Sequence, residues 1–277
     1  MGKAIFRVTD VDYWYPGGKP VLNSIGFEVQ EGERIAVLGA NASGKSTLLH
    51  LLDGLYFACT GKTAAFGTVL TEDSVETPPF SREFRQRVGF LFQNSESQLF
   101  CSTVEEELAF GPLQLRLSAE EVERRVDDTL RLFGIEHLRA RSPQALSGGE
   151  KRKVALASLI TCGPRVILLD EPSAGLDPRT QQWLVEFLDL LHRSGITLVT
   201  ASHDLSFVAE TVDRTLILSE DHRLVYDGPM MDALRDLDLL LSVNLIHAHA
   251  HRHDEKLHMH PHLHEMWHEH EHGTEAK

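Results

Sequence analysis

Residues 39–47 have the sequence Gly-Ala-Asn-Ala-Ser-Gly-Lys-Ser-Thr, and the pattern on either side of them predicts the fold. The apolar run at 35–38 predicts a buried strand, and Leu-Leu-His-Leu-Leu at 48–52 predicts the first turns of a helix. A strand, a glycine loop ending in Lys-Ser and a helix together surround phosphate groups, because backbone N–H groups point into the loop and the helix N-terminus carries partial positive charge. The alternative is an ordinary glycine turn before a helix, but the flanking strand and helix favour nucleotide binding.

The residue types in this loop have roles that follow from phosphate chemistry. Lys45 is expected to reach the β- and γ-phosphates, and the Ser46 hydroxyl is expected to bind Mg²⁺. The loop residues expected to contact the nucleotide are Gly39, Asn41, Ser43, Gly44, Lys45, Ser46 and Thr47.

The composition limits the classes of protein to which the chain can belong. It has 277 residues, enough for one large domain with a tail, and a formal net charge of −14, which argues against a nucleic-acid-binding surface. Cys59, Cys101 and Cys162 lie far apart, so neither a disulfide framework nor a zinc ribbon is expected. Because there is no signal peptide and no apolar run of about 20 residues, a cytoplasmic protein is expected, whose membrane role has to come through a partner.

Strand patterns dominate the first part of the chain, and helices follow. Strands are expected at 5–8, 25–29 and 34–38, and residues 55–92 read as a second set of strands, of which 87–92 is the clearest. A short helix is predicted over 103–110, ending at Gly111-Pro112, and a capping box at Ser118 predicts a helix to about residue 133. With a helix that opens at residue 147, these form a helical subdomain at about 100–162.

The remainder of the chain alternates strand and helix. Strands are predicted at 166–169 and 196–200 with a helix at 179–193 between them, and residues 216–227 are expected to form a hairpin followed by a short helix. Together with the strand and helix around the loop at 39–47, this alternation predicts an α/β fold with a mostly parallel core sheet.

Two carboxylates follow directly after the strand at 166–169. Asp170 is placed to hold Mg²⁺, and Glu171 is placed to orient and deprotonate an attacking water. Gln93 and His203 also follow predicted strands, where Gln93 could reach the metal and the water, and His203 could contact the γ-phosphate. Taken alone, each of these two is more often only a residue at a strand end.

Residues 147–150, Ser-Gly-Gly-Glu, have two interpretations. Ser147 before a helix and Glu150 three residues later form a capping box, which is purely structural. The serine, Gly148, Gly149 and the helix N-terminus also make a second anion site. If the two phosphate sites do not meet within one molecule, they predict a head-to-tail dimer with nucleotide between its subunits.

The ordered set of motifs resembles the ATP-binding subunit of ABC transporters over about residues 4–230. It comprises Tyr15, the loop at 39–47, Gln93, Leu-Ser-Gly-Gly-Glu at 146–150, the strand and carboxylates at 166–172, Ser-Ala-Gly-Leu-Asp at 173–177 and His203. The resemblance implies an ABC ATPase domain at 1–240, with an N-terminal antiparallel β-subdomain and an inserted α-helical subdomain, that hydrolyses ATP with Mg²⁺.

The same resemblance implies roles for individual residues. Tyr15 would stack on adenine, and Ser147 and Gly149 would contact the γ-phosphate of the other subunit's ATP. Asp177 would lie in the loop that joins the two sites, and His203 would be the switch histidine. Ala40 and Ala42 replace the proline and glycine common in the loop, and Glu150 replaces a glutamine; Ala42 fits only if its φ is negative.

Finer features resemble the energy-coupling factor (ECF) branch, which serves vitamin and transition-metal uptake. They are Phe-Gln-Asn at 92–94, Gln-Leu-Phe at 98–100, the run at 103–112 and Gly-Glu-Lys-Arg-Lys-Val-Ala at 149–155. The implied partners are a second ATPase subunit, a membrane scaffold protein and a substrate-capture membrane protein, with no nucleic acid. A homodimer is favoured because every motif is intact, and the expected location is the cytoplasmic face of the cell membrane.

A histidine-rich tail is expected at 241–277. Residues 247–272 contain 11 of the 16 histidines and few large apolar residues, which predicts disorder without a ligand. Nitrogen ligands favour Ni²⁺, Co²⁺, Cu²⁺ or Zn²⁺ over Mg²⁺. The alternating candidates for a transition-metal site are His247, His249, His251, His253, His258, His260, His262 and His264.

These observations predict the ATP-hydrolysing subunit of an ECF-type importer, and the tail favours nickel or cobalt as its substrate. The alternatives are an ECF-type ATPase for a vitamin and a soluble ABC ATPase with a metal-buffering tail. A soluble ABC ATPase of DNA repair or translation is disfavoured, because the chain has neither a long coiled-coil insertion nor a second ATPase domain.

Overall fold

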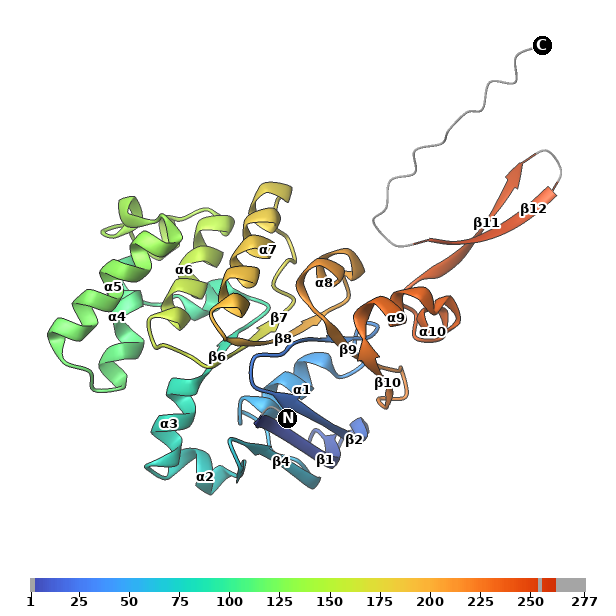
Figure 1. Cartoon of the computed structure of the whole chain (residues 1–277), viewed down its shortest axis with the longest axis horizontal. Helices are drawn as coiled ribbons and strands as arrows, with labels where there is room; N and C mark the ends of the chain where they lie inside the picture. The colour runs from blue at the N-terminus through green and yellow to red at the C-terminus, as the bar shows by residue number, and fades with distance from the viewer. Residues whose placement is uncertain (1–2, 254–255, 263–277) are drawn as a thin grey trace, which may run out of the picture.

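The computed structural model describes residues 3–253 and 256–262, and Figure 1 shows how its sheets and helices are arranged. A four-stranded antiparallel sheet has the order β2-β1-β4-β5. Its strands are β1 (Ala4–Trp14), β2 (Pro20–Gln30), β4 (Thr60–Ala65) and β5 (Thr68–Val69). Buried and more exposed positions broadly alternate along β1 and β2, because one face of an antiparallel sheet can pack on the core while the other faces solvent.

A six-stranded sheet in the order β10-β9-β3-β8-β7-β6 forms the centre of the molecule. The strands from β9 to β6 are parallel, and β10 pairs antiparallel with β9 at one edge. They are β3 (Arg34–Leu38), β6 (Val88–Leu91), β7 (Val166–Asp170), β8 (Thr197–Ser202), β9 (Arg214–Leu218) and β10 (Leu224–Pro229). The two sheets confirm the predicted α/β fold, with a mostly parallel core sheet and an antiparallel β-subdomain near the N-terminus.

Two apolar clusters cover opposite faces of the central sheet. Successive residues of a strand point to opposite faces, so Ile35 and Val37 of β3 belong to one cluster, and Ala36 and Leu38 belong to the other. The first cluster includes α1 (Lys45–Leu52) and the antiparallel sheet, and the second includes α7 (Pro178–Arg193) and α8 (Leu205–Thr211). Figure 1 shows α1 between the two sheets and α7 and α8 on the other side of the central sheet.

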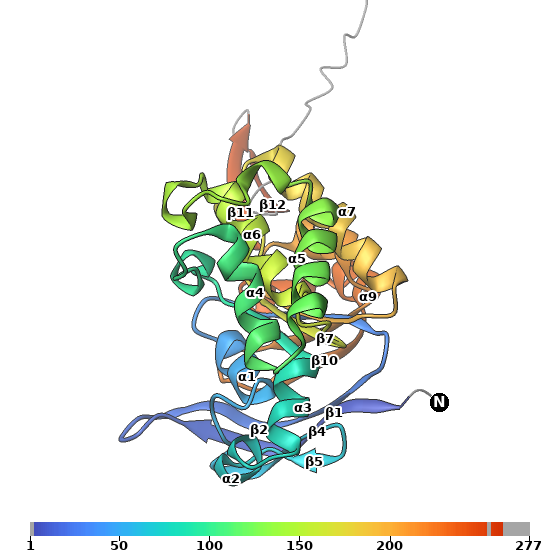
Figure 2. The ribbon, with the colours of Figure 1, turned by 90° about the vertical axis from the view of Figure 1, so that its left-hand side faces the viewer.

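Three helices pack together at one end of the molecule, as Figures 1 and 2 show from two directions. They are α4 (Val104–Gln114), α5 (Ala119–Phe133) and α6 (Gly148–Ile160). Both predicted N-cap residues accept a hydrogen bond: Thr103 Oγ1 from the Glu106 N–H, and Ser118 Oγ from the Glu121 N–H. Only this half of the predicted capping box at Ser118 is present, and the Glu121 carboxylate accepts from Arg124 and Arg125 instead. Gly134, in the left-handed conformation, ends α5 as predicted.

The prediction that Gly111-Pro112 ends α4 is wrong, because the helix continues to Gln114. A Cβ atom at Gly111 would collide with the Cys162 sulfur just beyond α6, so the two helices approach closely at this glycine. Pro112 removes one backbone donor but is buried there. Tertiary packing therefore maintains a helical turn that local propensity alone does not favour.

The prediction of strands and loops over 55–92 is partly wrong, because α2 (Glu72–Glu76) and α3 (Phe80–Arg87) lie in this range. Phe84 is fully buried, and its ring stacks on that of Phe80 one turn earlier with centroids 5.5 Å apart. Only this face of α3 is apolar, and the charged residues around it conceal the helical period. The remaining helices are α9 (Met230–Arg235), α10 (Leu237–Ser242) and the 3₁₀ helices η1 (Ser95–Gln98), η2 (Glu136–Leu138) and η3 (Pro143–Ala145).

The structure corrects the expected tail in two ways. Residue 241 does not begin it, because α10 extends to Ser242, and the apolar residues Val243, Leu245 and Ile246 are buried in the core. In place of disorder, β11 (His247–His253) and β12 (Lys256–His262) pair as an antiparallel hairpin. Alternation with a period of two suits a strand, which explains this difference. Residues 263–277, with His264, lie outside the described residues.

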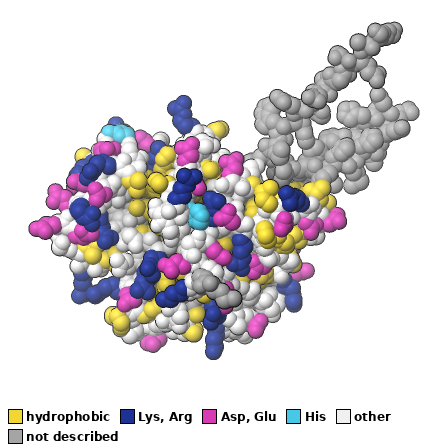
Figure 3. All heavy atoms as spheres, in the orientation of Figure 1, with side chains coloured by type: hydrophobic (Ala, Val, Ile, Leu, Met, Phe, Trp, Pro, Cys, Tyr) yellow, Lys and Arg dark blue, Asp and Glu magenta, His cyan; other side chains and the backbone are white. Residues whose placement is uncertain are grey.

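The surface is mixed in charge. On the face shown in Figure 3, basic and acidic side chains are interspersed over the folded part of the chain. Within residues 3–253 and 256–262, no helix has both the length and the apolar composition that crossing a membrane requires.

Candidate active site

The loop between β3 and α1 has the backbone that phosphate binding needs. Gly44 precedes α1 with φ 109°, and no side chain caps this helix, so its first N–H groups are open to a ligand. A Cβ atom at Gly39 would lie 2.5 Å from Ser43 Oγ and 2.7 Å from the Leu218 carbonyl oxygen, so only glycine fits there. The loop therefore closes tightly around the start of the helix.

Ala42 contradicts the prediction of a negative φ, because its φ is +65°. The Ser43 N–H donates to the Ala40 carbonyl oxygen at 3.2 Å, and this tight turn holds Ala42 in the left-handed region. An L-residue with a Cβ atom pays about 1 kcal/mol or more there. The apex of the loop is therefore strained in its resting form.

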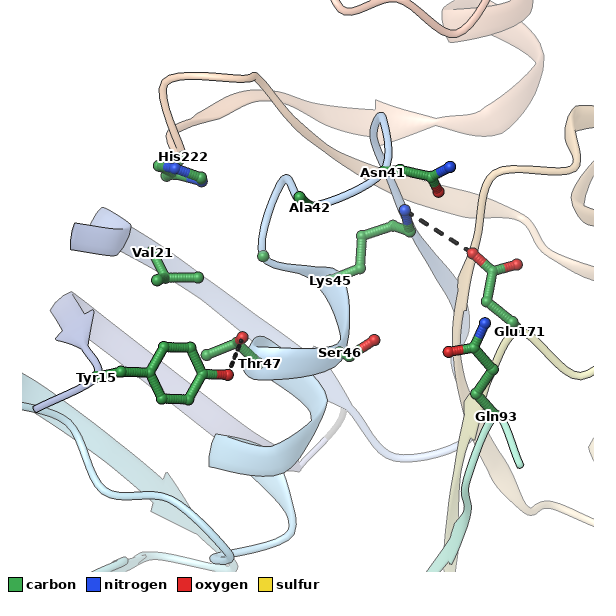
Figure 4. A pocket seen from close by; sticks show the side chains of 11 residues that line it. Tyr15, Val21, Asn41, Ala42, Lys45, Ser46, Thr47, Gln93, Glu171 and His222 are labelled. Carbon is green, nitrogen blue, oxygen red and sulfur yellow. Dashed lines mark hydrogen bonds and ion pairs between the residues drawn. The ribbon is translucent and has the colours of Figure 1, made fainter. Parts of the chain in front are cut away.

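A pocket of about 410 Å³ opens beside this loop, and Figure 4 shows its side chains. Its walls come from the antiparallel sheet, the loop, the first turn of α1, the ends of β6 and β7, and the turn between β9 and β10. The lining residues are Tyr15, Val21, Asn41, Ala42, Gly44, Lys45, Ser46, Thr47, Gln93, Glu171 and His222. The structure thus brings together residues from both halves of the chain that the sequence singles out separately.

Lys45 lies at the centre of this pocket and is held by its own loop. Its Nζ donates to the Gly39 carbonyl oxygen at 2.8 Å and to the Ala40 carbonyl oxygen at 3.1 Å, and it is 3.8 Å from Glu171 Oε1. Burial lowers the pKa of Lys45, while the nearby carboxylates of Glu171 and Asp170 oppose this shift. An incoming phosphate can therefore replace two carbonyl contacts of an ammonium group that is already in place.

Ser46 and Asp170 meet beside Lys45. Ser46 Oγ donates to Asp170 Oδ1 at 3.0 Å, at the end of β7. Burial raises the pKa of Asp170, and the hydrogen bond from Ser46 opposes this shift. A hydroxyl and a carboxylate oxygen at one point fit Mg²⁺, which prefers hard oxygen ligands and usually takes one or two carboxylates together with substrate phosphates.

Glu171 is buried at the pocket wall and is held by two neighbours. Its Oε1 accepts a hydrogen bond from His203 Nδ1 at 2.9 Å, and its Oε2 accepts one from Ser202 Oγ at 3.3 Å. Because the carboxylate accepts, Nδ1 of His203 carries the hydrogen. The backbone of Glu171 has φ +46°, an uncommon conformation for a non-glycine residue. The predicted base and the predicted switch histidine are thus in direct contact.

Tyr15 and Gln93 lie at opposite sides of the pocket (Figure 4). The Tyr15 hydroxyl is 3.1 Å from Thr47 Oγ1, within hydrogen-bond distance, and its ring packs edge-on against Tyr13 and Tyr56. Gln93 is exposed, and it also lines a second pocket together with Gly148 of α6. Gln93 therefore lies between the pocket beside Lys45 and the N-terminus of α6.

Ser147 and Glu150 form the predicted capping box at the start of α6. The Ser147 N–H and the Ser147 hydroxyl each donate to Glu150 Oε2 at 2.8 Å. These two hydrogen bonds lower the pKa of the Glu150 carboxyl group. Ser147 and Gly148 are exposed, Gly149 is half-buried, and none of the three is among the residues lining the nucleotide pocket of the same chain.

Asp177 caps α7, with its Oδ1 accepting hydrogen bonds from the Arg179 N–H at 3.0 Å and the Thr180 N–H at 3.1 Å. Thr180 Oγ1 also donates to Asp177 Oδ2 at 2.6 Å, so these hydrogen bonds of the exposed side chain are all with the first turn of its own helix. The role of Asp177 between two nucleotide sites stays a prediction.

Sequence reasoning missed two residues that line the pocket, Val21 and His222, and His222 is the one with a polar side chain. It lies in the turn between β9 and β10, and its Nδ1 is 3.2 Å from the Ser43 carbonyl oxygen. The sequence predicts the hairpin around it but gives no signal that its turn meets the loop at 39–47, because that contact depends on the order of strands in the sheet.

Comparisons with known proteins agree with this geometry. A family model described as "ABC transporter" matches residues 22–174. A putative ABC transporter ATP-binding protein from Methanosarcina acetivorans is 49% identical over 88% of this chain and 89% of its own length. The nickel import ATP-binding protein NikO from Rhodobacter capsulatus is 44% identical over 87% of this chain and 95% of its own length.

Two further similarities concern the ECF branch and a solved structure. The energy-coupling factor transporter ATP-binding protein EcfA from Methanothermobacter thermautotrophicus is 38% identical over 87% of this chain and 76% of its own length. The structure of cbiO1 from Clostridium perfringens, described as part of the ABC transporter complex cbiONQ, matches with a TM-score of 0.75 and 30% identity. It covers 87% of this chain and 95% of that one.

Proposed function

The chain belongs to the ABC transporter family of ATP-binding proteins, in its ECF branch, and from this premise we propose that it powers uptake of nickel or cobalt ions. The family membership makes it an ATPase with ATP as its substrate. The observation that carries the catalytic proposal is the position of Glu171, buried in the wall of the same pocket as Lys45 and hydrogen-bonded to His203.

In this proposal the polar residues in the pocket and directly behind its wall have different chemical tasks. Glu171 orients a water and accepts its proton while the oxygen attacks the γ-phosphorus and the bond to the β,γ-bridging oxygen breaks. Lys45 holds the β- and γ-phosphates, and His203 keeps the Glu171 carboxylate in place and faces the γ-phosphate. Ser46, Gln93 and Asp170 are the residues that would hold Mg²⁺, which neutralises phosphate charge when bound.

Glu171→Gln tests the catalytic assignment. The amide keeps the size of the side chain and a hydrogen-bond acceptor for His203 but cannot take a proton, so kcat is expected to fall by roughly 10² to 10⁴. ATP binding should remain, and a closed dimer should accumulate in size-exclusion chromatography with ATP. Glu107→Gln is the matched control, since Glu107 is also buried but lies outside the pocket. A variant at Glu171 with wild-type turnover contradicts the assignment.

The second nucleotide half-site is proposed to come from another subunit. Ser147 and Gly149 stand apart from the nucleotide pocket of their own chain, at an exposed helix N-terminus. A second copy arranged head to tail would bring them to the γ-phosphate bound by Lys45, and Asp177 would lie in the loop between the two sites. A homodimer is sufficient, because one chain carries both halves.

The proposed membrane partner is a scaffold protein that docks beside the Gln93 loop and also holds a substrate-capture protein. The support is an apolar patch next to that loop, on the chain that follows η1 and on α4. Phe100 and Phe110 are 62% and 42% exposed with ring centroids 4.9 Å apart, and Leu113 is 55% exposed. Through this contact the protein would be peripheral, at the cytoplasmic face of the membrane, and would transmit ATP-driven closure.

Nickel or cobalt as the transported ion is the finer part of the proposal. It is supported by the similarity to a nickel import protein and by the histidine-rich hairpin, whose register places His247 opposite His262, His249 opposite His260 and His251 opposite His258. Imidazole nitrogens suit these metals. The eight candidates from His247 to His264 named above are proposed to bind Ni²⁺, Co²⁺ or Zn²⁺.

Deleting residues 247–277 tests the tail separately from the ATPase. Isothermal titration with Ni²⁺ and with Mg²⁺ should show that the full chain binds Ni²⁺ at several sites and that the truncated chain does not. The truncated chain should keep its ATPase activity, because it retains every residue of the two apolar clusters and of the nucleotide pocket. Equal Ni²⁺ binding by both chains contradicts a metal site in the tail. Unchanged nickel uptake by the truncated chain would limit the tail to an accessory role.

A further inference from the structure

The turn between β9 and β10 brings His222 into the wall of the nucleotide pocket. His222 has φ +61°, in the left-handed region that most residues with a Cβ atom avoid. A strained conformation of this kind persists only when the surrounding structure holds it, and it is more frequent at functional sites. The conformation of His222 therefore indicates that the surrounding structure holds its imidazole in the pocket wall.

Three hydrogen bonds fix the position of His222. Its N–H donates to the Ser219 carbonyl oxygen at 3.0 Å, and its carbonyl oxygen accepts from the Asn23 N–H at 2.9 Å, which ties the turn to β2. Its ring Nδ1 lies 3.2 Å from the Ser43 carbonyl oxygen in the phosphate loop. The imidazole is therefore held between two segments that line the same pocket.

The contact with Ser43 decides which ring nitrogen is free. A carbonyl oxygen only accepts, so Nδ1 must carry the hydrogen, and in the neutral ring Nε2 is then an acceptor. Among the contacts of the described residues, the ring makes only this one hydrogen bond. Nε2 is thus left as a hydrogen-bond acceptor on a half-buried side chain.

The place of His222 in the pocket indicates which part of a nucleotide it meets. Figure 4 shows His222 on the same side as Val21 and Tyr15, with Lys45 between them and the far wall formed by Gln93 and Glu171. The far wall and Lys45 belong to the phosphate end. His222 therefore faces the nucleoside end, next to the apex of the loop.

Between the base and the phosphates, the hydrogen-bond donors of ATP are its two ribose hydroxyls, because phosphate oxygens only accept. We infer that Nε2 of His222 accepts a hydrogen bond from a ribose hydroxyl and that the site thereby binds the nucleotide more tightly than the deoxy analogue that lacks this hydroxyl. This rests on the proposed nucleotide site. It adds a specificity-determining residue that the loop, the carboxylates and the switch histidine do not supply.

The test measures the binding of ADP, 2′-deoxyADP and 3′-deoxyADP to the full chain by isothermal titration calorimetry. ADP avoids hydrolysis and dimer closure, which would complicate the measurement. His222→Asn is the variant of choice, because asparagine tolerates positive φ and its amide N–H can still donate to Ser43, but it has no atom in the place of Nε2. His222→Gln is the matched control, because its amide oxygen reaches toward the Nε2 position as an acceptor.

Wild-type protein is expected to bind ADP roughly fivefold to tenfold more tightly than one of the two deoxy analogues, the worth of about one hydrogen bond. His222→Asn should bind ADP with the affinity that wild type shows for that analogue, and its preference should disappear. His222→Gln should keep part of the preference.

Three results would overturn the inference. They are equal wild-type affinity for all three nucleotides, an unchanged preference in His222→Asn, and an equal loss for all three nucleotides in that variant, which would indicate a phosphate contact. The wild-type comparison does not depend on any variant folding. A chain that binds no ADP at all would contradict the nucleotide site itself, a different outcome from binding without preference.

Discussion

Two helix N-termini in this molecule are predicted to meet phosphate, and they are built differently. At α1 the preceding Gly44 is in a left-handed conformation, no side chain caps the helix, and Lys45 is buried against its own loop. At α6 Ser147 and Glu150 cap each other at the surface. The N-terminus of α1 has no side-chain cap and lies inside a pocket of its own chain. The N-terminus of α6 is capped and lies at the surface.

This difference indicates how each terminus is used. The first four N–H groups of a helix lack partners within it, so an uncapped terminus inside a pocket needs a ligand to satisfy them. The capping box already satisfies two donors of α6, and that helix keeps its form without nucleotide. This difference supports the proposal that α1 binds nucleotide within its own chain and that α6 presents a preformed surface to the nucleotide of a second subunit.

Ser147→Arg tests the exposed terminus of α6, and among the changes at or near these two helix termini it is expected to have the largest effect on activity. The bulky side chain would separate the capped terminus from the partner's γ-phosphate, so kcat is expected to fall roughly 10²-fold, like the loss of a preorganised contact to the transition state. ATP binding by the isolated chain should be unchanged, because Ser147 does not line its pocket. Steady-state ATPase assays and titration of the monomer with ATP measure the two quantities.

Ser118→Arg is the control for lost capping. Ser118 is also an exposed N-cap, with its Oγ accepting from the Glu121 N–H, and the change costs α5 a similar cap of about 1 kcal/mol. Its ATPase activity should stay near wild type. If the Ser147 variant loses monomer binding, or if both variants lose activity equally, the two termini are not divided between two molecules.

The regular elements could be predicted because their signals are local. The apolar run that forms β3 is continuous in the sequence, and the residues that cap α5 and α6 each lie within a few positions of one another. The structure confirms these elements within a residue or two. The end of α4 was not predictable in this way. There the packing of Gly111 in α4 against Cys162, just beyond the end of α6, decides the outcome, and these two residues are far apart in the sequence.

The residues of the site also fall into a group that local sequence signals predict and a group that depends on contacts between distant segments. The loop, Asp170 and Glu171 follow strands of the parallel core, and parallel strands bring their carboxyl ends to one edge, so the sequence indicates that these residues meet. His222 lies in a hairpin turn, and its contact with Ser43 depends on β9 lying beside β3. The strain at Ala42 depends on the closure of the loop on itself, which the residue type alone does not reveal.

Asp53 lies at the C-terminal end of α1, the helix whose N-terminus is in the pocket. Asp53→Asn tests whether its buried carboxyl group is neutral in the folded chain. Burial raises the pKa of Asp53 to about 7, and Arg85, 3.7 Å away, opposes the shift. Because this pKa is raised on folding, the stability linked to it is present at low pH and is lost as pH rises from about 4 to about 7. The variant should match wild type near pH 4 and be more stable by about 4 kcal/mol at pH 8, since each unit of pKa shift corresponds to about 1.4 kcal/mol.

Urea unfolding at several pH values measures this difference, and Asp177→Asn provides a control of opposite sign. Hydrogen bonds from Thr180 lower the pKa of the exposed Asp177, so the stability linked to Asp177 is lost as pH falls. Its replacement should therefore cost stability at neutral pH and not at low pH. A constant gap between Asp53→Asn and wild type across the pH range would mean that the carboxyl group is ionised in the folded protein throughout.

Ala42→Gly tests the strain in the open terminus, and the smallest effect is expected here. Glycine adopts φ +65° without a steric penalty, so the variant gains back the cost of the left-handed alanine, although its unfolded chain has more freedom to lose. The net gain in the free energy of unfolding is expected to be about 0.5 kcal/mol. Urea unfolding of the nucleotide-free chain measures it.

Ala157→Gly in α6 makes the sign of the effect decisive. Ala157 is fully buried inside a regular helix, so glycine there removes a packed methyl group and adds chain entropy to the unfolded state, at a cost of about 1 kcal/mol or more. The same substitution should therefore stabilise the loop and destabilise the helix. If Ala42→Gly also destabilises the chain, the nucleotide-free loop is not strained at Ala42. The uncapped form of the α1 N-terminus then depends on Gly44 and Lys45 alone.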